Sequence, residues 1–100
     1  MPATEEKVTC RTPTPGKKPT RIARRTFDAV RGAILKVLPK NGEGVLFTDL
    51  TRLVETKLAP EIRSEIGSLM WYVTVVKLEL EVRGEIRRVP DVSPQRLLRV

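Results

Sequence analysis

The sequence predicts a small domain that is mostly α-helical and carries a small antiparallel β-sheet. Apolar residues recur at helical spacing in three segments of residues 26–83. After Gly84, residues 86–89 and 96–100 form two short β-like runs around a loop that contains two prolines. Helical periodicity followed by a terminal β-ribbon gives this fold class.

Residues 1–19 are interpreted as a disordered, basic, Pro-rich arm, and residues 20–100 as the folded domain. The arm holds four of the eight prolines and shows no apolar periodicity. Residues 20–25 (TRIARR) are either a first, very basic helical turn or the last part of the arm.

A first helix is predicted between Thr26, a good N-cap, and Pro39, which ends it. Its buried face holds Phe27, Val30, Ile34 and Leu38. The turn over residues 41–44 has two glycines but lacks the Lys-Ser/Thr pair of a phosphate loop. Residues 45–47 are apolar and suit a short strand.

A second helix is predicted to begin at the N-cap Thr48 and to bury Leu50, Leu53, Val54 and Leu58. Residues 59–67 connect it to the next helix. Pro60 suits the first position of an extra helical turn within this connection, and Gly67 breaks that turn.

A third, central helix is predicted from Ser68 to Gly84. Two adjacent apolar stripes at helical spacing, Leu69-Val73-Val76-Leu80 and Trp71-Val75-Leu78-Val82, suit a helix buried in a small core. Residues 71–76 alone resemble a strand, but the longer apolar pattern and the glycine stop favour a helix. All four aromatic residues are expected in the core: Phe27, Phe47, Trp71 and Tyr72.

These elements follow the order helix, short strand, helix, helix, strand, strand. They enclose one core if the terminal ribbon folds back on residues 45–47. That arrangement is the winged-helix form of the helix-turn-helix.

Residues 80–88 (LEVRGEIRR) resemble the stretch that joins the recognition helix to the wing in MarR-like and PadR-like bacterial regulators. The helix end at residues 33–39, the Trp71-Tyr72 pair and the terminal PQRL at residues 94–97 are also similar to a group of small bacterial proteins of unassigned function. The resemblance covers residues 26–100. It implies a winged helix and DNA-binding regulation, although winged helices also serve as protein-contact modules.

The net charge of +7 is concentrated at the two ends of the chain. Residues 1–25 hold seven Lys/Arg against Glu5 and Glu6, and residues 83–100 hold five Arg against Glu85 and Asp91. Residues 26–82 are nearly neutral, with seven basic and eight acidic residues. Charge at the ends favours binding of a polyanion by those ends.

The composition argues against an enzyme, a metal or cofactor site, and a membrane protein. The chain has no histidine, and its carboxylates are scattered. The single cysteine, Cys10, excludes an internal disulfide and fits the cytoplasm. No apolar run is long enough to span a bilayer, no secretory signal is present, and no small-molecule substrate is evident.

The leading hypothesis is therefore a winged-helix protein that grips double-stranded DNA by its phosphates. The expected contact residues are Arg87, Arg88, Arg96 and Arg99 in the wing, Arg21, Arg24 and Arg25 in the arm, and Lys77 on the third helix. The alternative is an interaction module whose third-helix face, around Met70, Thr74 and Lys77, contacts a protein partner or a second copy. Glu81 completes that face, which is not basic.

Overall fold

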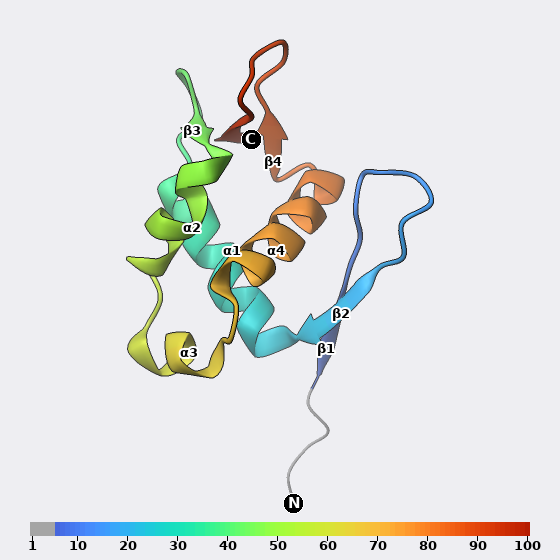
Figure 1. Ribbon diagram of the computed structural model, residues 1–100, viewed down its shortest axis with the longest axis vertical. Coiled ribbons are helices and arrows are strands. Elements are labelled where there is room, and N and C mark those ends of the chain that lie inside the picture. The colour runs from blue at the N-terminus through green and yellow to red at the C-terminus, as the bar shows by residue number, and fades with distance from the viewer. Residues whose placement is uncertain (1–5) are drawn as a thin grey trace, which may run out of the picture.

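The computed structural model describes residues 6–100 as a helical core flanked by two small antiparallel sheets (Figure 1). The elements are β1 (Lys7–Cys10), β2 (Thr20–Ala23), α1 (Arg24–Val37), β3 (Val45–Leu46), α2 (Phe47–Glu55), α3 (Pro60–Glu65), α4 (Leu69–Arg83), β4 (Ile86–Arg88) and β5 (Arg96–Arg99). The predicted fold class, mostly α with a small antiparallel sheet, is confirmed at this level.

Helix α4 crosses the middle of the molecule and packs on α1 and α2 (Figure 1). The Ser68 hydroxyl caps it by accepting from the backbone N–H of Trp71 at 3.3 Å. Gly84 ends it in the left-handed conformation, with φ of 76°. Fully buried side chains from the three helices meet there: Phe27, Val30, Ile34, Leu50, Val54, Val73, Val76 and Leu80.

The C-terminal ribbon folds back on the short strand between α1 and α2, as expected. Strand β5 lies between β3 and β4, with Val45 opposite Leu97 and Ile86 opposite Arg99. A Cβ on Gly44 would lie 2.7 Å from the carbonyl oxygen of Leu97. The glycine therefore permits the close approach of β3 to β5.

The prediction that Thr26 and Thr48 cap these helices is wrong, because both helices begin before these residues. Backbone carbonyls from distant parts of the chain accept the hydrogen bonds at the two helix starts. At the start of α1, the N–H of Arg24 donates to the carbonyl of Glu6 at 2.8 Å. At the start of α2, the N–H of Phe47 donates to the carbonyl of Gln95 at 3.0 Å. Neighbouring strands thus satisfy donors that a capping side chain would otherwise serve.

The expected disordered arm differs from the structure over residues 7–10, which form β1 and pair with β2. Val8 lies opposite Ile22 and Cys10 opposite Thr20. Val8, Cys10 and Ile22 are buried and belong to the main core. Alternation along β1 places its two apolar side chains on one face, where they pack between α1 and α4. Residues 11–19 of the predicted arm form the loop between these two strands, and residues 1–5 lie outside the described part of the chain.

The prediction that Trp71 lies in the core is wrong, because 46% of its surface is exposed. Its ring meets that of Tyr72 edge to face, with centroids 4.9 Å apart. Phe27 is fully buried, and Phe47 and Tyr72 are partly buried against the core. The apolar stripe that contains Trp71 is the outer, less buried one of α4, and the antiparallel pair of β1 and β2 covers only part of it.

Candidate nucleic-acid interface

Most cations on the body of the molecule are already paired with carboxylates. On the surface, Arg24 pairs with Glu6 and Arg25 with Glu65, both at 2.9 Å, and Arg63 pairs with Glu55 at 2.7 Å. Such exposed pairs contribute little to stability, but they satisfy the guanidinium groups. The cations that remain without an acidic partner within residues 6–100 show where the surface is available to an external anion.

Four of these cations lie on the hairpin formed by β1, residues 11–19 and β2, which we call the N-terminal hairpin. Lys7 and Arg21 alternate with the buried Val8 and Ile22, so they occupy the outer face of the ribbon. Lys17 and Lys18 are exposed in its loop. None of the four has a carboxylate within 4.0 Å among residues 6–100.

Three more lie on the hairpin formed by β4, residues 89–95 and β5, which we call the wing hairpin. The register places Arg87 opposite Leu98, so Arg87 and Arg96 share one face of the sheet with the buried Leu98. Arg87 is exposed, and Arg96 donates one N–H to the carbonyl of Gly44 at 3.2 Å. Arg99 is half-buried, and its Nε is enclosed without a partner.

The other predicted wing residue, Arg88, turns toward α4 instead. Its guanidinium donates to both carboxylate oxygens of Glu81, including Nη2 to Oε2 at 3.4 Å. The register therefore divides the four wing arginines between the two faces of the sheet, with Arg87 and Arg96 on one face and Arg88 and Arg99 on the other.

Lys77 was expected on an exposed recognition face, and the structure buries it to 2% exposure. Its Nζ pairs with Glu81 at 2.8 Å and lies 4.7 Å from the centre of the Phe47 ring. Burial lowers the pKa of Lys77, and the Glu81 carboxylate partly offsets that effect. With its charge already enclosed and paired, Lys77 is no contact residue for DNA in this conformation.

The expected arm contacts are also reorganised. Arg21 lies on β2, whereas Arg24 and Arg25 form the first turn of α1 and carry the surface ion pairs described above. These arginines therefore belong to ordered elements, and residues 6–25 supply no flexible arm for a minor groove. The N-terminal hairpin replaces the arm as the basic element.

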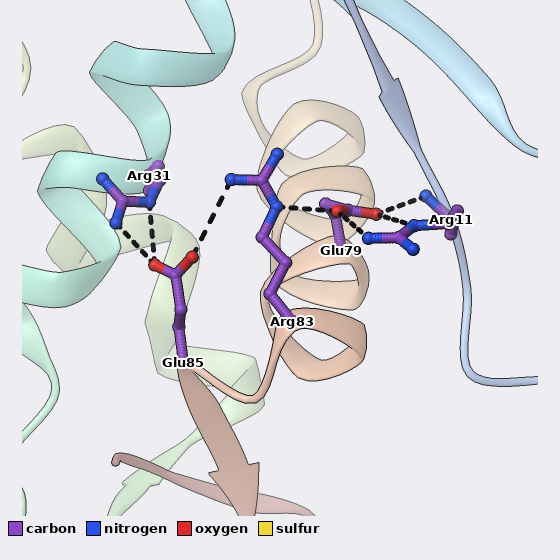
Figure 2. Close-up of polar contacts among 5 residues, drawn as sticks. All are labelled: Arg11, Arg31, Glu79, Arg83 and Glu85. Carbon is purple, nitrogen blue, oxygen red and sulfur yellow. Dashed lines mark hydrogen bonds and ion pairs between the residues drawn. The ribbon is translucent and has the colours of Figure 1, made fainter.

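A chain of ion pairs fixes the N-terminal hairpin and the start of β4 onto the helices (Figure 2). Glu79 of α4 accepts from the backbone N–H and the guanidinium of Arg11 at 2.8 to 3.1 Å, and from Nε of Arg83 at 2.7 Å. Arg83 reaches on to Glu85 at 3.8 Å, and Arg31 of α1 pairs with Glu85 at 2.6 Å. This network links three parts of the chain: the N-terminal hairpin, α1, and the end of α4 with the residues that follow it.

Sequence reasoning missed the role of Glu79, because its main partner is 68 residues away. Glu79 is 1% exposed. Burial alone would raise its pKa, but hydrogen bonds from the side chain and backbone of Arg11 and from Arg83 outweigh burial and hold the pKa at about 2. The carboxylate is therefore ionised whenever the domain is folded at ordinary pH.

Because this folded-state pKa lies below the ordinary value of 4.5, ionised Glu79 stabilises the fold above pH 4.5, and that stabilisation is lost as the pH falls toward 2. We expect Glu79→Gln to lower the free energy of unfolding by roughly 1–3 kcal/mol at neutral pH. Urea titrations between pH 7 and pH 2.5 measure the difference from the parent, which should shrink with acid. The exposed Glu61→Gln is the control, and a difference that stays constant across this pH range contradicts the assignment.

The middle of α4 presents no free recognition face. The Glu81 side chain is enclosed by Lys77 and Arg88, and the Thr74 hydroxyl donates to the carbonyl of Met70 at 2.8 Å. Only the first turn is open, where Met70 is 63% and Trp71 46% exposed. This turn offers apolar surface rather than donors that match base edges or phosphates.

Neither a cluster of metal ligands nor an exposed thiol is present among the described residues. No group of three His, Cys, Asp or Glu within residues 6–100 is placed to hold a metal ion. Burial, with a smaller contribution from Glu79, raises the pKa of the Cys10 thiol to about 11, so the thiol stays protonated. None of the helices in this part of the chain is long and apolar enough to cross a membrane.

The chain matches a known protein family. The model of a family of unknown function (DUF6958) matches residues 7–97. This match includes the N-terminal hairpin, all four helices and the wing hairpin as far as Leu97. No curated protein and no solved structure shows a significant match.

Proposed function

We propose that this chain, which belongs to the DUF6958 family, is a winged-helix protein that binds double-stranded DNA through its phosphates. The N-terminal hairpin and the wing hairpin supply the contacts. Recognition rests on charge and backbone geometry, with little readout of base sequence.

The order of elements supports the winged-helix part of the proposal. From α1 onward the chain runs helix, strand, helix, helix, helix, strand, strand, and its sheet has the order β3-β5-β4. In this interpretation α4 takes the place of the recognition helix, and the wing hairpin is the wing. Helix α3 and the N-terminal hairpin are additions to that plan.

The observation that carries the DNA proposal is where the unpartnered cations lie. Within residues 6–100, the cations without a carboxylate partner are mostly on the two hairpins: Lys7, Lys17, Lys18 and Arg21 on one, and Arg87, Arg96 and Arg99 on the other. The remaining ones are Lys36, Lys40 and Lys57. Phosphates neutralised by such groups release counterions, which is the main source of sequence-independent affinity.

The shape of the N-terminal hairpin suits the same role. A two-stranded β-ribbon fits the major groove of B-DNA. Here the outer face of the ribbon carries Lys7, Thr9 and Arg21, whereas the inner face is buried. In Figure 1 the loop of this hairpin and the wing hairpin lie on either side of the C-terminal end of α4.

A second candidate function has one specific observation in its favour. Met70 and Trp71 expose adjacent large apolar side chains at the start of α4. Aromatic residues and Met are enriched at protein interfaces. A protein partner, or a second copy of the chain, is therefore the alternative ligand, and it would use a different surface from the hairpins.

Two variants separate these functions. Arg87→Gln with Arg96→Gln removes two wing charges that lack a carboxylate partner within residues 6–100, and Met70→Asp removes apolar surface from α4. We expect the wing variant to bind a labelled random duplex roughly tenfold or more weakly in fluorescence anisotropy at 0.1 M salt. The Met70→Asp variant should bind it like the parent. If instead Met70→Asp abolishes self-association or partner binding and the wing variant binds DNA unchanged, the interaction module is the correct function.

A further inference from the structure

A cleft of about 340 Å³ lies between the loop of the N-terminal hairpin and α4. Pockets for small organic ligands begin at about 300 Å³. The cleft is partly open to solvent, and Arg11, which lines it, anchors the hairpin to Glu79 at 2.8 Å. It is therefore a hollow between two elements that the ion-pair network holds together.

The floor of the cleft is apolar. Val75 and Leu78 come from the outer stripe of α4, and the buried Cys10 adds its protonated thiol. Both α4 residues are only half-buried, because the hairpin loop stands off from them. An apolar group seated there would remove this surface from water, which is favourable in proportion to the area covered.

The rim of the cleft is cationic and rich in hydrogen-bond donors. Lys17 and Lys18 line it, and neither has an acidic partner within residues 6–100. The Thr12 hydroxyl accepts from the N–H of Thr14 at 3.2 Å, so its own proton remains to be donated. No lining residue is acidic, and the nearby Glu79 is neutralised by Arg11 and Arg83. This electrostatic environment favours an anion.

We propose that this cleft binds a small organic anion, with the anionic group at Lys17 and Lys18 and an apolar chain against Val75 and Leu78. A bare inorganic anion leaves the apolar floor uncovered, and a neutral lipid-like molecule leaves the lysines without a partner. An amphiphilic carboxylate satisfies both parts of the cleft. The cleft shares Lys17 and Lys18 with the proposed DNA surface, whereas Val75 and Leu78 take part in the cleft proposal alone.

The test uses the full ¹⁵N-labelled chain and three probes: sodium octanoate, 1-octanol and inorganic phosphate. Octanoate should give saturable shifts in the amides of residues 75–78 and of the non-proline residues among 11–20. The dissociation constant for each of the other two probes should be at least roughly tenfold higher, because each probe offers one of the two contacts. Shifts that do not saturate, or that centre on Met70 and Trp71, would overturn the proposal.

A matched pair of variants completes the test. Lys17→Gln with Lys18→Gln should raise the dissociation constant for octanoate about tenfold, since charge-assisted hydrogen bonds are the stronger ones. Lys36→Gln with Lys57→Gln removes the same charge from exposed sites outside the cleft and should leave it unchanged. All four positions are exposed, so the fold should survive, as a dispersed spectrum would verify. Equal weakening in both variants would reduce the effect to net charge and refute a site at the cleft.

Discussion

Deleting residues 1–19 is expected to destroy or strongly weaken the cooperative unfolding transition. The deletion removes β1, and with it the buried side chains of Val8 and Cys10 and the Arg11–Glu79 ion pair. It also strips Ile22 of its strand partner. Burying one medium-sized apolar side chain contributes about 1.5–3 kcal/mol. Since a small domain has only about 5–15 kcal/mol of total stability, the combined loss takes most of it.

A pair of point variants on β1 gives the control for this deletion. Val8→Ala should cost roughly 1–3 kcal/mol in denaturant titrations, because Val8 is buried among core residues. Thr9→Ala, on the exposed face of the same strand, should cost less than about 0.5 kcal/mol. If the truncated chain unfolds at the midpoint of the parent, the hairpin is no part of the core and the disordered-arm prediction stands.

Neutralising the N-terminal hairpin is expected to produce the largest change in DNA affinity. At 0.1 M salt, each lost phosphate contact lowers the binding constant by nearly one power of ten. The triple variant Lys17→Gln, Lys18→Gln, Arg21→Gln should therefore bind a random duplex roughly 10²- to 10³-fold more weakly. These side chains are exposed and make no ion pair within residues 6–100, so stability should barely change.

The charge-matched control for that variant is Lys36→Gln, Arg52→Gln, Lys57→Gln. All three positions are exposed and lie on neither hairpin. This control removes the same net charge, so it measures the contribution of long-range attraction alone. If both triple variants lose affinity equally, the hairpin is no specific contact surface.

Local signals were enough to predict the central helix and the C-terminal ribbon. Ser68 caps α4 and Gly84 ends it, as the sequence indicates, and residues 45–46 do pair with the ribbon. Both features depend on nearby residues or on a repeated apolar pattern. The fold class followed from them.

What sequence reasoning missed depends on contacts between distant residues. Strand β1 is four residues long, and its partner lies beyond a loop that contains three prolines, so no local pattern marks the hairpin. The caps of α1 and α2 are replaced by the carbonyls of Glu6 and Gln95. Without β1, nothing in the sequence indicates that Arg11 lies beside Glu79, so their ion pair could not be predicted.

The candidate site was predicted in part for the same reason. Charge counting found the basic ends of the chain, which became the two hairpins. It could not find that Lys77 is enclosed by Glu81 and Phe47, because helical periodicity alone does not place an amphipathic side chain inside or outside. The sequence also predicts that both apolar stripes of α4 are buried, whereas Trp71 lies on an outer stripe and is 46% exposed.

The most direct test of phosphate binding measures the affinity of the unmodified chain for a random duplex at a series of salt concentrations. Fluorescence anisotropy of the labelled duplex gives the affinity at each concentration. Seven cations on the two hairpins lack a carboxylate partner within residues 6–100, and the proposal assigns about half or more of them to contacts with one duplex. Each contact contributes about −0.9 to the slope of log affinity against log salt, so we expect a straight line with a slope of about −3 to −6. A slope near zero would contradict the proposed function. So would the absence of binding at about 50 mM salt, where the Debye length is about 14 Å and charge attraction is only weakly screened.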